Sequence, residues 1–177
     1  MSKSTISELL GEYDRALAYT DELWNDLTAE EVQWRESDDS SAIGWHLGHQ
    51  PAVAHYMVRN LTAAEPPLDP ELDRLMDSAT PEHDRGVLPD LSTLRSYRDE
   101  VAERVRFRIG NINSGTVGAP VQLRVIAHTL MIAVINHEYQ HDKWIGEVRS
   151  GVHGRDLPPN PTSERLTTIE GYLVVER

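Results

Sequence analysis

Four long segments of the sequence repeat apolar residues at helical spacing, and this repetition constrains the fold more than any other feature. The segments cover residues 5–27, 41–61, 92–110 and 120–150. A helix with an apolar stripe along one side must bury that stripe against other elements. Four such helices, joined by one long connection and otherwise short loops, predict an all-α fold: an antiparallel four-helix bundle with a long crossover loop. Binding sites in such bundles are built in the core from side chains on facing helices.

Residues with strong preferences for helix ends mark where these helices begin and stop. The patterns Thr5-x-x-Glu8 and Thr28-x-x-Glu31 are capping boxes, in which a hydroxyl and a carboxylate bind backbone N–H groups that the helix leaves free. The first helix is therefore expected to begin after Thr5, and a short helical turn after Thr28. Pro120 suits the first turn of the last helix, and Gly151 is its expected end.

The second segment, residues 41–61, contains a proline inside its helical pattern. Pro51 removes one backbone hydrogen bond, so we expect the helix to kink just after His49. The stripe of this helix that faces the core is predicted to contain, in chain order, Ala42, Trp45, His49, Val53, Tyr56 and Asn60.

Two stretches interrupt the helical pattern. Residues 62–89 are acidic and contain five prolines, with a short helix expected over residues 70–78. A connection of this length either crosses the bundle as a solvated segment or forms a lid or pocket wall. Residues 111–118 are rich in glycine and small polar side chains and are expected to form a loop.

The C-terminal residues differ in character from the rest. Residues 166–176 have the composition of a β-strand. Because a lone strand is not stable, this segment either forms a hairpin with its turn at Glu170-Gly171 or pairs with a second subunit. We therefore divide the chain into a helical bundle, residues 1–152, and a C-terminal extension, residues 153–177, and expect a homodimer.

The composition excludes several classes of function. A formal net charge of −12 argues against binding to nucleic acid and to anionic membranes, because both require clustered Lys and Arg. The absence of cysteine rules out disulfides, thiolate metal sites and a cysteine nucleophile. No apolar run reaches the length of about 18 residues that a membrane span needs, and no signal peptide is visible at the N-terminus. We expect a cytoplasmic protein.

Two histidines near the end of the last predicted helix form a candidate metal site. His137 and His141 are four residues apart, so their side chains project from the same face of a helix and can reach one ion. They continue the predicted apolar stripe of that helix, which contains Leu123, Ile126, Leu130, Ala133, Val134, Ile145 and Val148. Two buried imidazoles need partners, and a cation can serve both. His49, on the inward stripe of the second helix, is the best third ligand.

The remaining histidines are weaker candidates. His46 lies one turn before His49 and could support a ligand or replace one. His55 and His128 are predicted to lie on the far faces of their helices. His83 and His153 are in predicted loops. The alternative for His137 and His141 themselves is a pair of neutral core histidines that bind carbonyl groups or water.

The same segment matches the pattern His-Glu-x-x-His of zinc proteases, in which the glutamate is a general base. Glu138 would occupy that position. No downstream third ligand follows, and no strand pattern precedes the motif to bind an extended peptide. A contact at the helix surface, or one that supports a metal ligand, is the preferred role for Glu138.

These motifs together resemble the DinB-like superfamily of metal-binding four-helix bundles. The resemblance is carried by Ser41-Ala-Ile-Gly-Trp-His-Leu-Gly-His49, by His137-Glu-Tyr-Gln-His141 with Arg149, and by the approach Leu27-Thr-Ala-Glu-Glu-Val-Gln-Trp-Arg35. The residues of these motifs most resemble those in the N-terminal domain of ergothioneine-pathway sulfoxide synthases. The resemblance implies a metal site of His49, His137 and His141, the three residues that spacing also selects, with one divalent zinc, iron, nickel or manganese ion.

Members of this superfamily include thiol S-transferases, a thiol-dependent maleylpyruvate isomerase and the iron-dependent sulfoxide synthases. The 177 residues contain no counterpart of the second domain of the synthases, so we expect a different reaction. The leading expectation is a metal-dependent thiol S-transferase that acts on a small molecule together with a low-molecular-weight thiol. Tyr56 is the preferred polar residue of the pocket, and Arg149 or the 62–89 connection is expected to bind substrate carboxylates.

Two alternatives remain open from the sequence. The first keeps the metal and changes the reaction to a hydrolase, isomerase, cyclase or iron-dependent oxygen enzyme on a specialised metabolite. The second is a bundle without catalytic activity that binds metal through the same histidines. A catalytic site should open onto a pocket, whereas a structural site should be closed and four-coordinate.

Overall fold

The computed structural model describes residues 4–62 and 65–176. Their elements, in chain order, are α1 (Ile6–Trp24), α2 (Ala29–Val32), α3 (Ile43–Arg59), α4 (Pro70–Met76), α5 (Glu82–Arg85), α6 (Leu91–Ser114), α7 (Pro120–Gly151), β1 (Leu166–Ile169) and β2 (Tyr172–Val175).

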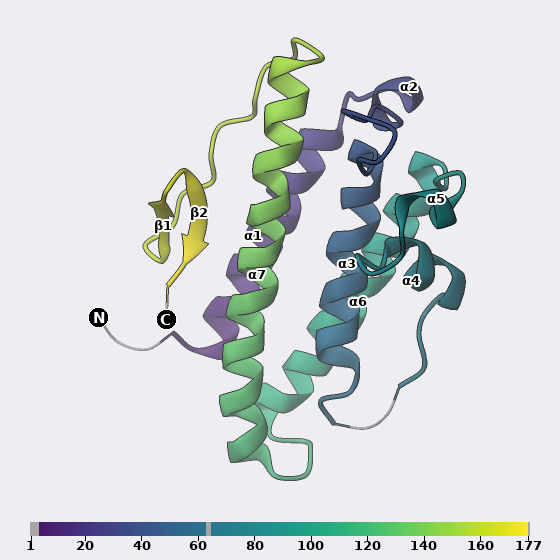
Figure 1. The fold of residues 1–177 in the computed structure, drawn as a ribbon. Helices are drawn as coiled ribbons and strands as arrows, with labels where there is room; N and C mark the ends of the chain where they lie inside the picture. The colour runs from purple at the N-terminus through teal and green to yellow at the C-terminus, as the bar shows by residue number, and fades with distance from the viewer. Residues whose placement is uncertain (1–3, 63–64, 177) are drawn as a thin grey trace.

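The four long helices α1, α3, α6 and α7 lie side by side as a bundle (Figure 1). Helices α1 and α7 run in one direction, and α3 and α6 run in the opposite one (Figure 1). Helix α3 packs mainly on α6 and also on α7, and α1 packs mainly on α7. The predicted all-α bundle is confirmed. The long crossover from α3 to α6 explains how two neighbouring helices can run in the same direction.

The helix ends follow the local signals with one exception. Both capping boxes form: Thr5 accepts from the backbone of Glu8, and Thr28 from that of Glu31. Helix α6 continues to Ser114, four residues beyond its predicted end. The reason is that Gly115, with φ of 77°, supplies the left-handed conformation that ends a helix.

Helix α3 is continuous from Ile43 to Arg59, with Pro51 inside it. Its predicted inward stripe is wrong in the second half, where Tyr56 and Asn60 are exposed and Ala54, His55 and Val58 are buried. The first half of α3 is buried on all sides because α2, α4, α6 and α7 surround it. Beyond Pro51 only one side of α3 is buried, and it is not the side that the sequence pattern predicts.

The crossover between α3 and α6 contains ordered helices. The short helix predicted over residues 70–78 is present as α4, and α5 follows it. Helix α4 packs on α3 and buries Leu72, Leu75 and Met76. This connection is therefore part of the core, and it covers the half of α3 that carries His46 and His49 (Figure 1).

The C-terminal segment forms a hairpin, which is one of the two arrangements that the sequence left open. Strands β1 and β2 are antiparallel, and the turn residues Glu170 and Gly171 have positive φ values of 51° and 83°. Positive φ at both central positions matches the right-handed twist of the strands. The hairpin packs on α7, where the amide of Asn136 binds the backbone N–H of Val175 at 2.7 Å and its carbonyl at 3.1 Å. The boundary at residue 152 stays a prediction.

Among the described residues, no helix is long and apolar enough to cross a membrane.

Candidate metal centre

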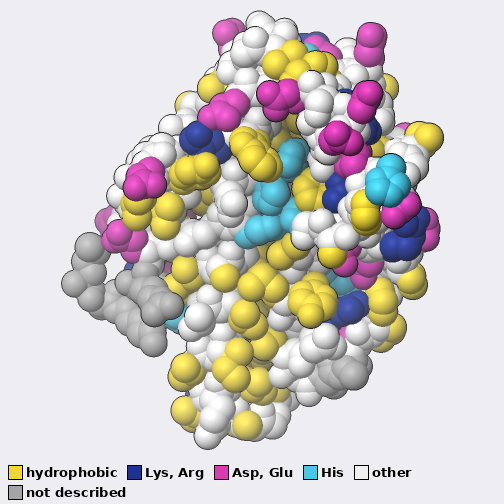
Figure 2. Space-filling view, viewed as in Figure 1, with side chains coloured by type: hydrophobic (Ala, Val, Ile, Leu, Met, Phe, Trp, Pro, Cys, Tyr) yellow, Lys and Arg dark blue, Asp and Glu magenta, His cyan; other side chains and the backbone are white. Residues whose placement is uncertain are grey.

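The structure brings together the three histidines that the sequence selects. One ring nitrogen from each of His49, His137 and His141 lies within 4.8 Å of the others. His49 comes from α3, and His137 and His141 come from successive turns of α7. Histidine side chains are visible near the centre of one face of the molecule, flanked by hydrophobic side chains (Figure 2). The cluster is thus built between two facing helices of the bundle and reaches the surface.

His49 is held in a defined orientation. Its Nδ1 lies 2.6 Å from the carbonyl oxygen of Met76, which can only accept, so Nδ1 carries the proton. Its Nε2 is therefore left with a lone pair. The indole of Trp45 stacks on the ring at 4.1 Å, and the N–H of that indole donates to the carbonyl of Leu75. Helix α4 thus fixes the tautomer of His49, as commonly seen for histidines that bind metals.

His137 and His141 contact each other and a fourth histidine. The Nε2 atoms of His137 and His141 are 3.0 Å apart, and Nδ1 of His141 is 2.8 Å from Nδ1 of His46. A neutral imidazole has one N–H and one lone pair. In each contact one nitrogen must therefore donate and the other accept, or a cation must lie between two lone pairs.

The electrostatics keep all four rings neutral at pH 7. Burial lowers the pKa of His141 to about 2, and the positive charges that His137, His46 and His49 would carry lower it further. Burial also lowers the pKa of His46 to about 3 and that of His137 to about 4. The pKa of His49 is lowered for the same reason, despite its bond to Met76. Neutral imidazoles are the form that binds a metal ion.

The donor set fits one divalent cation. His137, His141 and His49 can each offer Nε2, and no further Cys, Asp or Glu joins the cluster among the residues that the structure describes. Three imidazole nitrogens suit zinc, iron, nickel and related ions. Three protein ligands leave open positions, which is the arrangement of catalytic rather than structural sites.

Two glycines let other elements approach the helix that carries His49. A Cβ atom at Gly48 would lie 2.4 Å from the sulfur of Met76, the residue whose carbonyl holds His49. A Cβ atom at Gly44 would lie 2.4 Å from Cγ1 of Val32 and 2.9 Å from its carbonyl oxygen. The glycines in Ile43-Gly-Trp-His-Leu-Gly-His49 therefore allow α2 and α4 to close around the site.

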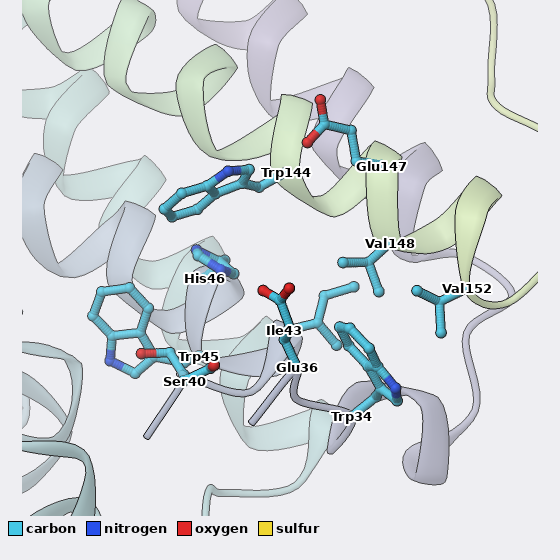
Figure 3. A pocket seen from close by; sticks show the side chains of 11 residues that line it. Trp34, Glu36, Ser40, Ile43, Trp45, His46, Trp144, Glu147, Val148 and Val152 are labelled. Atoms are coloured by element: carbon cyan, nitrogen blue, oxygen red, sulfur yellow. The ribbon is translucent and has the colours of Figure 1, made fainter. Parts of the chain in front are cut away.

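A cavity adjoins the cluster. It has a volume of about 490 Å³ and is lined by Trp34, Glu36, Ser40, Ser41, Ile43, Trp45, His46, Trp144, Glu147, Val148 and Val152. Of the four histidines that contact one another, His46 lines this cavity. The rings of Trp45 and Trp144 flank His46 (Figure 3). The carboxylate of Glu36 points into the space between the α3 and α7 side chains (Figure 3). The cluster thus has a neighbouring pocket large enough for a small molecule.

Comparison with known protein families agrees with the resemblance that the sequence motifs carry. The sequence profile of the DinB superfamily matches residues 12–145, which include most of α1, all of α3 and α6, and the three clustered histidines. The chain belongs to the DinB superfamily. No curated protein matched the chain.

The side chain of Glu138 in this DinB domain points toward α1 and α6 and not toward the three histidines, so its predicted role at the helix surface or beside a ligand is wrong. Its side chain is 2 % exposed and forms an ion pair with Arg98 of α6 at 2.5 Å. Thr20 of α1 is 2.8 Å from the same carboxylate oxygen. A carboxylate held in this way cannot be the general base of a zinc protease, so that alternative is excluded.

Around Glu138 lies a buried polar network that sequence patterns did not reveal. Asp142 is 2.7 Å from Thr20 and accepts from Gln50 at 2.9 Å. The single hydrogen of the Thr20 hydroxyl can serve only one of the two carboxyl groups, so the other short contact requires a proton on a carboxyl group. Burial and the charge of Glu138 raise the pKa of Asp142 well above its usual value. Asp142 therefore holds the proton, and Glu138 is ionised against Arg98.

This network also explains an error in the predicted stripe of α7. Ile126 is 47 % exposed, and Leu123 and Leu130 are only partly buried. The most buried line of α7 instead contains Met131, Ile135, Glu138, Asp142 and Ile145. Because two of these residues are acidic, a search for apolar periodicity places the centre of the buried face about one residue away.

Tyr56 and Arg149 do not contribute to the metal centre. Tyr56 is 69 % exposed and does not line the cavity beside the cluster, so its predicted pocket position is wrong. Arg149 forms an ion pair with Asp26 and donates to the carbonyl groups of Leu23 and Asp156. Its guanidinium therefore joins α1, α7 and the segment that follows α7, rather than recognising substrate as predicted.

The other histidines lie away from the cluster, although two are buried against expectation. His128 is 7 % exposed and bonds to the hydroxyl of Ser4, and His55 is 2 % exposed in the contact of α3 with its neighbours. His83 is exposed beside Asp84, and His153 packs edge-on against Trp34. Neither His83 nor His153 folds back onto the site.

We expect His55→Leu to stabilise the DinB domain. Neither ring nitrogen of His55 has a hydrogen-bond partner among the described residues, and an unpartnered buried polar group costs about 1–3 kcal/mol. Burial lowers the pKa of His55 below its ordinary value of 6.5. Below pH 6.5 the His55 side chain binds a proton in the unfolded chain but not in the folded chain. His55 therefore destabilises the fold more as pH falls. Urea unfolding should give a gain of about 1 kcal/mol at neutral pH and a larger gain at about pH 5.5. An equal or lower stability at both pH values would contradict this.

Proposed function

We propose that this chain is a metal-dependent enzyme that acts on a small molecule, and that the reaction is thiol S-transfer with a low-molecular-weight thiol as cosubstrate. The observation that supports the proposal most directly is the cluster of three neutral imidazoles beside a cavity of about 490 Å³. A non-catalytic bundle would not need open metal positions next to such a pocket.

The residues of the chain have separable roles in this proposal. His49, His137 and His141 would hold one divalent ion, and Met76 orients His49 through its carbonyl. When bound, such an ion lowers the pKa of a coordinated thiol or water and polarises a carbonyl group. The indoles of Trp45 and Trp144 shield one side of the site from water, which strengthens the electrostatic interactions in it.

Two features favour a thiol over the alternative reactions. The chain has no cysteine, so a sulfur nucleophile would have to arrive as a cosubstrate. The superfamily that the sequence motifs resemble also includes thiol S-transferases. In such a reaction the thiol sulfur forms a bond to an electrophilic carbon of the substrate, the leaving group departs with the electron pair of its broken bond, and the thiol proton passes to solvent.

Metal content tests the site. Elemental mass spectrometry of untagged protein should find about one divalent ion per chain. The double variant His137→Ala, His141→Ala should lose it. The matched control is His83→Ala, His153→Ala, which removes two histidines outside the cluster and should keep the ion. If no zinc, iron, nickel or manganese binds to the parent after reconstitution, the proposal fails.

The reaction is tested separately on the loaded protein. Low-molecular-weight thiols are offered with an electrophilic aryl chloride, and thioether formation is followed by absorbance and mass spectrometry. We expect a rate that depends on the metal and is lost in His137→Ala, His141→Ala. A site that holds iron and shows metal-dependent oxygen consumption without thioether formation would favour the oxygen-dependent alternative instead.

A further inference from the structure

His46 lies between the metal cluster and the cavity. It is 8 % exposed, its Nδ1 is 2.8 Å from Nδ1 of His141, and its ring lines the cavity. Its Nε2 forms no hydrogen bond with a described residue, and this atom is not fully buried. It therefore reaches the solvent-accessible space of the cavity that the ring lines. One ring thus touches a metal ligand with one nitrogen and the pocket with the other.

The protons on these rings are linked. His137 and His141 approach each other through their Nε2 atoms, so a cation shared by both requires a lone pair on Nε2 of His141. The proton of neutral His141 must then be on Nδ1, where it can only be donated to Nδ1 of His46. His46 must accept through Nδ1 and carry its own proton on Nε2. The opposite arrangement would place a proton on Nε2 of His141 and prevent it from binding the ion.

Two indoles hold His46 in this orientation. Trp45 lies 5.3 Å from the ring at an angle of 73°, and Trp144 lies 5.4 Å away at 63°. Such edge-to-face contacts on two sides restrict rotation of the imidazole. The N–H that results at Nε2 therefore has a fixed position in the cavity (Figure 3).

We propose that His46 is a positioning residue: it accepts the Nδ1 proton of His141, which keeps His141 in its metal-binding tautomer, and it presents its own Nε2–H to a hydrogen-bond acceptor of the substrate in the adjoining cavity. This inference rests on the proposed metal-dependent function and adds a substrate requirement to it. The ligand of the cavity carries a carbonyl, carboxylate or similar acceptor at the end near His46, with an apolar body against Trp144 and Ile43.

Tautomers give the first test. Long-range ¹H–¹⁵N spectra of the zinc-loaded protein distinguish a histidine protonated on Nδ1 from one protonated on Nε2. We expect His46 protonated on Nε2, and both His49 and His141 on Nδ1. Finding the proton of His46 on Nδ1 in the zinc-loaded protein would overturn the inference.

Two substitutions give the second test. The side-chain oxygen of asparagine can replace Nδ1 of His46 as acceptor, whereas leucine has a similar volume and no acceptor. We expect His46→Leu to weaken zinc binding about 10–100-fold, as found for other residues that orient metal ligands, and His46→Asn to remain within about fivefold of the parent. Zinc affinity is measured by competition with a chromophoric chelator.

Controls separate this role from a purely structural one. His128→Leu makes the same change at a buried histidine that bonds to Ser4, far from the cluster, and should keep the parent affinity for zinc. The thermal midpoints of the metal-free His46→Leu and His46→Asn variants should agree, so that a difference in zinc affinity is not a difference in folding. If the parent binds zinc and His46→Leu binds it equally well, the inference on His46 fails while the proposed function stands. If the parent binds no metal, both fail.

Discussion

Arg98→Leu is expected to lower the free energy of unfolding by about 3–5 kcal/mol, because it leaves the carboxylate of Glu138 buried without a counter-charge. Arg98 and Glu138 are 3 % and 2 % exposed, and their ion pair spans 2.5 Å between α6 and α7. The same guanidinium donates to the carbonyl of Leu17 on α1. The substitution therefore removes a contact that joins three helices. Urea unfolding followed by circular dichroism measures the effect.

Three further variants show which contacts of this network contribute to the free energy of unfolding. Asp21→Ala removes the exposed partner of Arg98 and should cost less than about 1 kcal/mol. Asp142→Asn replaces a carboxyl group that already holds a proton and should also cost less than about 1 kcal/mol. The double variant Arg98→Leu, Glu138→Leu removes both charges and should recover much of the loss. If Asp142→Asn were as damaging as Arg98→Leu, the assignment of the proton to Asp142 would be wrong.

Gly44→Ala is expected to destabilise the fold by about 1–3 kcal/mol, because the added methyl group has no room. Its Cβ atom would lie 2.4 Å from Cγ1 of Val32 and 2.9 Å from the carbonyl oxygen of the same residue. A backbone oxygen cannot rotate away, so α2 must move from α3. The segment after α2 provides Trp34 and Glu36 to the wall of the cavity, so that wall should shift as well.

Gly110→Ala is the matched control, because it introduces the same methyl group in a helix where nothing lies within 4 Å. There the better helix propensity of alanine should stabilise the domain by about 0.5–1 kcal/mol. Urea midpoints of the two variants should therefore move in opposite directions. A stabilising Gly44→Ala would show that α2 is not held against α3 as the structure has it. Tryptophan emission should change in Gly44→Ala alone, since Trp34 lies on the displaced segment.

The sequence alone determined the four long helices, the short helix α4 and the three clustered histidines. Helical spacing and capping residues act over a few neighbours along the chain, so Thr5, Thr28 and Glu170-Gly171 predicted their local structures correctly. The same is true of His137 and His141, whose separation of four residues is fixed by the helix itself. His49 joins the cluster as predicted, because it follows Trp45 by about one helical turn in the half of α3 that is buried on all sides.

Only the tertiary structure decided which polar residues face the core and what they touch. Glu138 and Asp142 look like surface residues in the sequence, because burial of a carboxylate depends on partners such as Arg98 and Thr20 that are distant along the chain. Tyr56 was assigned to the pocket from the period of one helix, but the packing of the bundle buries another side of α3 at this level. The contact of His46 with His141, 95 residues apart, has the same origin. Hydrogen bonds and charge pairs between helices depend on how the helices pack, and the pattern of a single helix does not contain that information.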